Sequence, residues 1–174
     1  MLDRDGVINK DSDAYIKSPE EWKPIPGSLE AIALLHKNGF KIVVITNQSG
    51  LGRGLFSLET LSQMHTKMQQ SVEAEGGEIE SIYFCPHGPD EGCGCRKPRP
   101  GLLKTFAREK GVELNGIPFV GDTLKDIEAA VAVGAQPILV KTGKGAKTWE
   151  TNPSIGVPVF EDLYDAAKYI VLGK

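Results

Sequence analysis

Short apolar runs alternate with helical patterns along this chain, and that alternation limits the possible folds more than any other feature. Four runs rich in β-branched residues have the length and composition of buried strands. They cover residues 40–46, 79–84, 117–121 and 136–140. Helical patterns cover residues 28–38, 57–75, 101–111, 126–134 and 162–172. Strand-helix-strand units with short links form right-handed crossovers, so the sequence predicts a doubly wound α/β fold with a mostly parallel sheet covered on both faces.

Serines and glycines mark where the first helices begin and end. Ser28 and Ser57 are placed to cap the first two helices, and Gly39 is placed to end the first. Met64 and Met68 are four positions apart, which predicts that both face the core. His36 and His65 are expected on helix surfaces.

The first strand of such a sheet is nearly absent from the sequence. A strand should precede Asp3, yet only Met1 and Leu2 do, whereas a buried central strand normally has about 5 residues. Either a few residues precede Met1 in the native protein, or this strand is unusually short.

Size and charge favour one domain and exclude some partners. A chain of 174 residues without a linker or repeat predicts a single domain over residues 1–174. The net charge of −3 lacks the basic excess of nucleic-acid-binding proteins. No segment approaches the roughly 18 apolar residues of a membrane span, and no signal peptide is recognisable. We therefore expect a cytoplasmic monomer that binds neither nucleic acid nor membrane, and that holds any anion by local positive charge.

Acidic residues follow two of the predicted strands. In open α/β sheets ligands bind beyond the carboxyl ends of the strands. Asp3 and Asp5 point to the same side of an extended backbone, and Gly6 lets the chain turn away from them. Asp122 follows a later strand, with Asp126 one helical turn beyond. Oxygen-rich sites of this kind suit Mg²⁺, which typically brings phosphate with it.

Hydrogen-bond donors and positive charges follow the other strands. Thr46, Asn47 and Ser49 offer hydroxyl and amide groups that could hold a phosphoryl oxygen. Arg96 and Lys97 supply the cations that an anionic substrate requires. Each motif alone could be an ordinary polar turn, but polar residues that end three strands of one sheet favour a functional site.

All three cysteines and one histidine lie within eleven consecutive positions. They are Cys85, His87, Cys93 and Cys95. This set matches the ligands of a tetrahedral structural Zn²⁺ site, and the bland alternative is a coincidence of reduced cysteines. Zinc would hold a loop that has no core of its own and so present the neighbouring Arg96 and Lys97.

Two further glycine-rich stretches do not fit the motifs that they suggest. "SGLGRGLF" would need glycine at Leu55 to be a dinucleotide fingerprint, and "KTGKGAKT" has Ala146 where a phosphate loop has glycine. Neither predicts a nucleotide site.

The motifs "DRDG", "ITNQSG", "CRKP" and "GDTLKD", in this order, resemble those of the haloacid dehalogenase superfamily of phosphatases. The resemblance extends from Asp3 to about Lys144, and nothing here is long enough to be a large cap domain. The "CPH…CGC" loop is similar to that of a group that acts on a heptose bisphosphate or on histidinol phosphate. "NQSGLGRG" and "DSDAYIKSPEEW" look more like the heptose enzymes.

That resemblance implies an activity and a set of residue roles. The activity is Mg²⁺-dependent removal of the 7-phosphate from a heptose 1,7-bisphosphate, in the synthesis of lipopolysaccharide precursors, through an aspartyl-phosphate. Asp3 would be the nucleophile and Asp5 the general acid/base. Thr46 and Lys97 would stabilise the transferring phosphoryl group. Mg²⁺ would be held by the carboxylates of Asp3 and Asp122 and the backbone carbonyl of Asp5. The substrate would contact Asn47, Gln48, Ser49, Arg53 and Arg96.

Three other functions compete with this one. The close alternative is histidinol-phosphate phosphatase. A requirement for a second phosphate on the substrate would distinguish the heptose enzyme from it. A DNA 3′-phosphatase of the same superfamily would need a basic groove, against which the net charge of −3 counts. A non-enzymatic zinc-knuckle module would leave the acidic residues at the strand ends without a purpose. The short zinc loop leaves the anomer of the substrate open.

Overall fold

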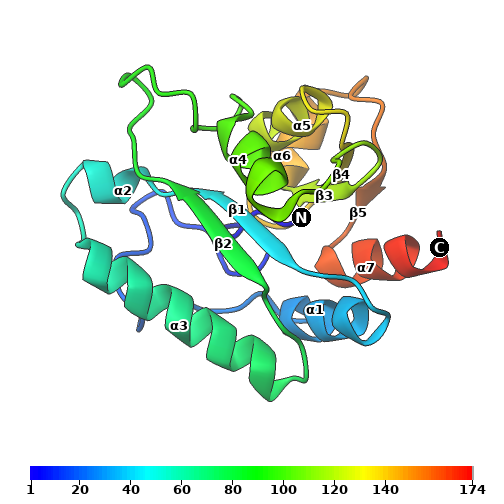
Figure 1. Cartoon of the computed structure of the whole chain (residues 1–174), viewed down its shortest axis with the longest axis horizontal. Helices are drawn as coiled ribbons and strands as arrows, with labels where there is room; N and C mark the ends of the chain where they lie inside the picture. Colours follow the sequence, from blue (N-terminus) through cyan, green and yellow to red (C-terminus); the bar gives the residue numbers. More distant parts are fainter. Residues whose placement is uncertain (174) are drawn as a thin grey trace.

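Five short strands form the parallel core of the protein (Figure 1). The computed structural model describes residues 1–173, and Lys174, the last residue of the predicted domain, lies outside them. The strands are β1 (Val43–Asn47), β2 (Ser81–Cys85), β3 (Pro118–Gly121), β4 (Gln136–Val140) and β5 (Val159–Phe160). The helices are α1 (Ser28–Lys37), α2 (Ser49–Gly52), α3 (Leu58–Ala74), α4 (Gly101–Lys110), α5 (Leu124–Val131), α6 (Gly145–Thr151) and α7 (Leu163–Leu172). The order of elements confirms the predicted α/β class, although α2, α6 and β5 were not predicted.

The segment at Leu2 completes the sheet between β1 and β3. Leu2 forms parallel bridges to both Val44 and Val120. Its amide donates to Val43 O at 2.8 Å, and Ile45 N donates back to Leu2 O at 2.8 Å. On the other side Asp3 N donates to Val120 O at 2.9 Å. The strand is as short as the sequence indicates, and pairing on both sides fixes Asp3 at its carboxyl end.

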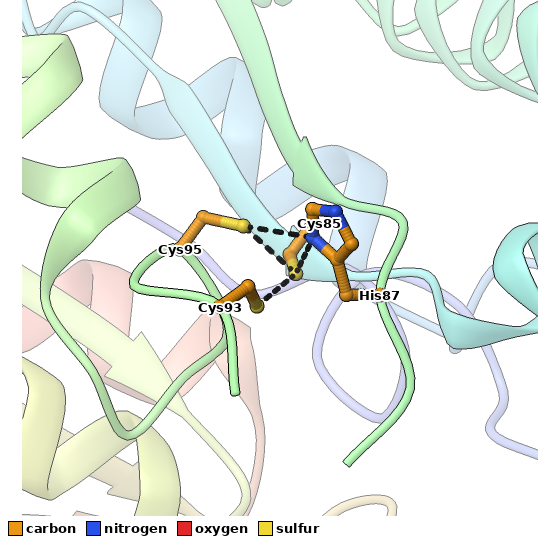
Figure 2. Close-up of side chains that lie close together, drawn as sticks. All are labelled: Cys85, His87, Cys93 and Cys95. Atoms are coloured by element: carbon orange, nitrogen blue, oxygen red, sulfur yellow. Dashed lines mark hydrogen bonds between the residues drawn. The ribbon is translucent and has the colours of Figure 1, made fainter. Parts of the chain in front are cut away.

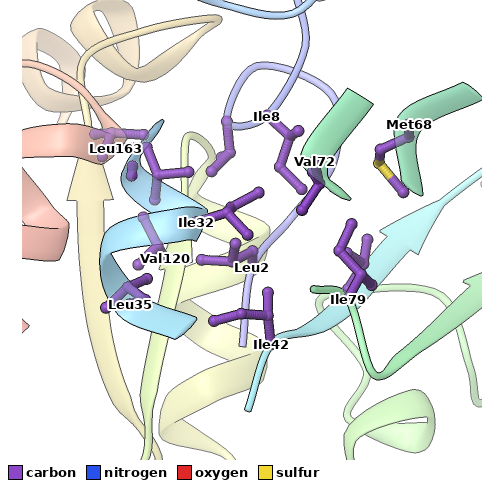
Figure 3. Packing of buried hydrophobic residues seen from close by; sticks show 14 of the residues in the cluster. Leu2, Ile8, Ile32, Leu35, Ile42, Met68, Val72, Ile79, Val120 and Leu163 are labelled. Carbon is purple, nitrogen blue, oxygen red and sulfur yellow. The ribbon is translucent and has the colours of Figure 1, made fainter. Parts of the chain in front are cut away.

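Side chains of the central strands alternate between two cores. Val44 and Val120 pack into a cluster with helices α1, α3 and α7, in which Leu2 is fully enclosed (Figure 3). Val43 and Ile45 point to the opposite face and pack against Leu103 of α4 and the alanines of α5. Helices therefore cover both faces (Figure 1), as expected for a doubly wound sheet.

Helix starts agree only partly with the prediction. Ser57 caps α3 by accepting a hydrogen bond from Thr60 N at 3.1 Å, as predicted. The cap predicted at Ser28 is wrong: Gly27 occupies the cap position, and the Ser28 hydroxyl donates to Ile8 O at 2.7 Å. Met64 and Met68 are fully buried, which confirms their predicted place in the core. Among residues 1–173, none of the helices combines the length and apolar character that crossing a membrane requires.

Candidate active site

A cavity of about 260 Å³ opens where the strands end, and polar side chains line it. It is lined by Asp3, Asp5, Asp11, Ser12, Asp13, Tyr15, Ile16, Thr46, Asn47, Gln48, Ser49, Arg96, Lys97, Asp122, Thr123, Lys125, Asp126 and Lys144. All predicted catalytic and magnesium residues are in this set. Of the predicted substrate residues, only Arg53 is outside it: its guanidinium lies 6.0 Å from the ring centre of Tyr15, which does line the cavity.

Lys97 is buried at the floor of the cavity, and three oxygen atoms surround its ammonium group. Its Nζ atom lies 2.6 Å from Asp126 Oδ1, 2.8 Å from Asp3 Oδ1 and 2.8 Å from Ile45 O. An ammonium group has three N–H donors, so each can be paired. Burial alone would lower the Lys97 pKa, but the carboxylates of Asp126 and Asp3 raise it above its usual value. Lys97 is therefore a fixed positive charge beside Asp3.

Asn47 holds the backbone of Lys97 from the end of β1. Its side-chain oxygen accepts from Lys97 N at 3.0 Å, and its side-chain amide donates to Lys97 O at 3.1 Å. The segment that directly follows the predicted zinc loop is thus tied to the end of β1 at the cavity.

Asp3 and Asp122 lie close together and are both buried. Burial raises the pKa of Asp3 well above its usual value; Lys97 lowers it, and the charges of Asp126 and Asp122 raise it. Burial, followed by the charge of Asp126, raises the pKa of Asp122 to about 7. Carboxylates that raise one another's pKa are stabilised in their ionised form by a cation placed among them.

The oxygen atoms of Asp3, Asp122 and Asp126 lie within 4.8 Å of one another, which fits a divalent cation. Asp126 is already engaged, because its second oxygen accepts from Thr123 N at 3.0 Å and from the Thr123 hydroxyl at 2.6 Å. That capping box starts α5. Asp3 and Asp122 are left as the carboxylates best placed for Mg²⁺.

Glycines allow the loops to meet around Asp122. Gly6 has φ of +81°, and a Cβ atom there would overlap the carboxylate of Asp122. Gly143 has φ of +57°, and a Cβ atom there would also overlap that carboxylate. Beside it, Lys144 N donates to Asp122 Oδ2 at 2.8 Å. The loop that follows Leu2 and the loop that follows β4 can therefore approach each other closely only because Gly6 and Gly143 are glycines.

Asp5 is held as a carboxylate by its neighbours. Arg4 donates to both of its oxygens, from Nη2 at 2.8 and 3.0 Å. Asn9 and Gln48 each donate to it at 2.8 Å. Burial would raise the pKa of Asp5, but the charge of Arg4 and these hydrogen bonds together lower it. These contacts favour the ionised form of Asp5, which can accept a proton.

His65 contacts Arg4, and its position differs from the one predicted from the sequence. It was predicted on the surface of its helix, but it is only 9% exposed, and its Nε2 atom lies 3.5 Å from Arg4 Nη1. Burial, followed by the charge of Arg4, lowers the pKa of His65 to about 4. It is therefore neutral at physiological pH and can accept from Arg4. His36 is exposed, as expected.

The loop after the first strand adds cavity residues that had not been assigned a role. Asp11, Ser12, Asp13 and Tyr15 line the cavity, and Tyr15 has φ of +65°, the only positive φ of a non-glycine residue within residues 1–173. The Nζ atom of Lys144 lies 3.2 Å from Asp11 Oδ2 and 3.2 Å from Asp13 Oδ1. The one signal for them in the sequence is "DSDAYIKSPEEW", which resembles the heptose enzymes.

The four predicted zinc ligands converge on one point (Figure 2). Cys85 Sγ lies 3.5 Å from His87 Nδ1, 3.6 Å from Cys93 Sγ and 3.1 Å from Cys95 Sγ. Zn–S and Zn–N bonds of about 2.3 and 2.1 Å place tetrahedral ligand atoms at comparable separations. The donor set and its geometry therefore fit Zn²⁺.

Comparisons with known proteins agree with this geometry. Residues 94–166 match the family described as HAD-hydrolase-like. D-glycero-beta-D-manno-heptose-1,7-bisphosphate 7-phosphatase of Pseudomonas putida is 54% identical over 171 residues, which cover 98% of each chain. The enzyme of that name from Bordetella bronchiseptica is 49% identical, over 98% of this chain and 96% of its own.

Two solved structures share the fold. The crystal structure of D,D-heptose 1,7-bisphosphate phosphatase from B. bronchiseptica, in complex with magnesium and phosphate, matches with a TM-score of 0.96 and 49% identity, over 99% of this chain and 97% of the other. The corresponding phosphatase from Burkholderia thailandensis matches with a TM-score of 0.78 and 42% identity, over the same shares. The chain therefore belongs to the haloacid-dehalogenase-like hydrolases, in the family of the heptose-bisphosphate phosphatases.

Proposed function

We propose that this protein is a Mg²⁺-dependent phosphatase that removes the 7-phosphate of D-glycero-β-D-manno-heptose 1,7-bisphosphate, in the synthesis of lipopolysaccharide heptose precursors. The observation that carries the proposal is the buried group of Asp3, Lys97 and Asp122 at the ends of adjacent strands. The relatives that are 44 to 54% identical over nearly the whole chain carry the name of that activity, and their names specify the β anomer, which the sequence left open.

Asp3 and Asp5 divide the reaction into two steps. A carboxylate oxygen of Asp3 attacks phosphorus, forming an O–P bond as the bond from phosphorus to the sugar oxygen breaks, and Asp5, which must carry a proton at this step, gives it to that oxygen. Water then attacks the aspartyl-phosphate and displaces the Asp3 carboxylate, while Asp5 takes a proton from the water. The hydrogen bonds that keep Asp5 ionised favour its part in the second step.

The surrounding residues balance the charge of the transferring group. Lys97, fixed by three acceptors, lies where it would neutralise an equatorial phosphoryl oxygen. Thr46, with its hydroxyl 2.9 Å from Gln48 Nε2, would donate to another. The carboxylates of Asp3 and Asp122 and the carbonyl of Asp5 would hold Mg²⁺, which supplies further charge neutralisation when bound.

Zn²⁺ would have a structural role in the loop between β2 and α4. Cys85, His87, Cys93 and Cys95 provide a closed four-ligand set without an open position for chemistry. Arg96 follows this set directly, and its Nη1 atom donates to His87 O at 3.1 Å. Zinc would thereby position Arg96 to bind the end of the substrate that does not react, next to Asn47, Gln48 and Ser49. Arg53 would contribute by supporting Tyr15.

The experiment that tests the proposal measures phosphate release with Mg²⁺ from both anomers of the heptose bisphosphate and from histidinol phosphate. We expect preference for the β bisphosphate, lost in Asp3→Asn. Preference for histidinol phosphate would keep the mechanism and overturn the substrate. A single domain over residues 1–174, a monomeric state and a cytoplasmic location remain predictions, which light scattering, limited proteolysis and cell fractionation would test.

A further inference from the structure

Arg4 is a buried cation behind Asp5, the proposed general acid/base. Only 1% of its side chain is exposed, against 22% for Asp5, and Arg4 is not among the residues that line the cavity. Within residues 1–173 its guanidinium forms an ion pair with Asp5 alone. Replacing a buried ion pair by apolar side chains is often neutral for stability or even stabilising. Stability alone therefore does not explain an arginine at this place.

The guanidinium of Arg4 holds the plane of the Asp5 carboxylate. Arg4 Nε donates to Asp5 Oδ1 at 3.0 Å, and Nη2 donates to Oδ1 at 2.8 Å and to Oδ2 at 3.0 Å. A planar fork of this kind fixes the rotation of a carboxylate, which a single-point contact does not. With Asn9, Oδ1 accepts from three nitrogen atoms, whereas Oδ2 accepts from two, Arg4 Nη2 and Gln48 Nε2. Oδ2 is therefore the oxygen with more room for a proton.

His65 supports the remaining nitrogen of the fork from helix α3. Arg4 Nη1 lies 3.5 Å from His65 Nε2, and both side chains are buried. Because arginine can only donate, the imidazole accepts in this contact. The ring of His65 packs against that of Phe84 on β2, with 6.0 Å between the ring centres. The guanidinium thus contacts Asp5 along one edge and a ring held by the core at its other nitrogen.

We propose that Arg4, supported by His65, is a positioning residue for the proton transfers of Asp5: it fixes the orientation in which Oδ2 exchanges a proton with the leaving oxygen and with the attacking water. This inference rests on the proposed function, because it assumes that Asp5 acts as acid and base. Proton transfer requires the two heavy atoms to approach to about 2.6–3.2 Å. A carboxylate that rotates freely reaches this geometry less often, so loss of Arg4 lowers turnover rather than substrate binding.

Variants of Arg4 separate orientation from charge, with kcat and KM measured for the heptose bisphosphate. Arg4→Lys keeps the charge but not the fork, and Arg4→Met removes both. Because a displacement of about 1 Å can cost about 100-fold in rate, we expect kcat to fall about 100-fold in Arg4→Met and about tenfold in Arg4→Lys, with KM changed less than about twofold. Val72→Ala is the matched control, since Val72 is a fully buried core residue of α3. It should lower the melting temperature and leave kcat unchanged.

Two variants test the part of His65. His65→Leu removes the acceptor for Arg4, whereas His65→Gln keeps one. We expect kcat to fall about fivefold in His65→Leu, which corresponds to one hydrogen bond, and to stay near the wild-type value in His65→Gln.

A double-mutant cycle with Asp5→Asn shows whether Arg4 acts through Asp5. Single turnovers with the enzyme in excess extend the measurement to slow variants. In the Asp5→Asn background, Arg4→Met should cost less than about twofold, because the group that Arg4 positions no longer transfers protons. If Arg4→Met does not fold, Arg4→Lys takes its place in the cycle.

The outcomes distinguish this inference from the function on which it rests. An equal loss in both backgrounds would mean that Arg4 supports the fold rather than Asp5 and would overturn the inference, as would wild-type kcat in Arg4→Lys. Wild-type kcat in His65→Leu would overturn the part assigned to His65. Full activity in Asp5→Asn would instead refute the acid/base role of Asp5, and with it the proposed mechanism.

Discussion

The ammonium group of Lys97 lies 2.6 Å from Asp126 Oδ1, and this buried contact is shorter than its 2.8 Å contact with the predicted nucleophile, Asp3. The two carboxylates respond in opposite ways: burial would raise the pKa of both, but Lys97 and Thr123 keep that of Asp126 low, whereas that of Asp3 is raised. Asp126 is therefore the main counter-ion of Lys97. Lys97 therefore neutralises the charge of Asp3 less than it would if Asp3 were its only partner. The Asp3 carboxylate stays available to a metal ion and a phosphoryl group.

Asp126→Asn should lower kcat about 10- to 100-fold, because the amide no longer provides the charge-assisted hydrogen bond that fixes Lys97. Lys97 would then pair more tightly with Asp3 and reduce its reactivity. The measurement is steady-state phosphate release, with the melting temperature recorded in parallel. Asp162→Asn is the control, since Asp162 caps α7 by accepting from Asp165 N at 2.9 Å and does not line the cavity. Equal kcat in wild type and Asp126→Asn would contradict the role of Asp126.

Cys95→Ser should remove bound zinc and reduce both stability and activity. Cys95 Sγ lies 3.2 Å from His87 Nδ1 and 3.1 Å from Cys85 Sγ, so its loss opens the four-ligand set. Elemental analysis should find one zinc per wild-type chain and close to none in the variant. As a control for the catalytic metal, chelator-treated wild type should regain activity with Mg²⁺ and Zn²⁺ together but not with Mg²⁺ alone. A wild-type chain purified without zinc would refute this prediction.

The sequence predicted which residues would gather around most of the candidate site, because parallel strands bring their carboxyl ends to one edge. Asp3, Thr46 and Asp122 could be grouped from that rule alone, and the zinc ligands from their spacing. The short first strand was recognised in the sequence, but what stabilises it was not. Its stability comes from pairing with Val44 on one side and Val120 on the other, and these contacts are not visible in the sequence.

Residues brought to the cavity by loop conformation were not predictable. Lys144 belongs to a stretch that failed as a phosphate loop, and it reaches the site only because Gly143 adopts a positive φ beside Asp122. His65 looked like a surface residue because its burial depends on Arg4, a long side chain that enters the core from a distant segment. Such contacts depend on tertiary packing, which local periodicity does not report.

Lys144→Ala should weaken substrate binding without abolishing turnover. Its ammonium group ties Asp11 and Asp13 to the loop after β4, and exposed ion pairs contribute about 0.2–1 kcal/mol. We therefore expect KM to rise about two- to fivefold with kcat nearly unchanged. Hydrogen exchange over residues 11–15 should also become faster. Lys147→Ala, an exposed lysine of α6 without an ion pair among residues 1–173, is the control, and a loss of kcat alone in Lys144→Ala would contradict the prediction.

His65 should make the protein less stable in mild acid. Burial, followed by the charge of Arg4, lowers its pKa from 6.5 to about 4 in the folded state. The unfolded chain therefore binds a proton that the folded chain does not between these values. The contribution of the neutral histidine to the free energy of unfolding is fully present above pH 6.5. It is lost as the pH falls towards the folded-state pKa of about 4. At about pH 5 the loss should be roughly 2 kcal/mol.

Urea unfolding near pH 7.5 and near pH 5, without added Mg²⁺, measures this loss in the wild type and in His65→Gln. Glutamine keeps an acceptor for Arg4 but does not titrate, so the variant should lose about 2 kcal/mol less stability than the wild type between the two pH values. The carboxylates titrate in both proteins, and their contribution cancels in the comparison. His36→Gln removes an exposed histidine and should follow the wild type. If the wild type and His65→Gln lose the same stability in acid, His65 is protonated in the folded protein, and its hydrogen bond from Arg4 does not form.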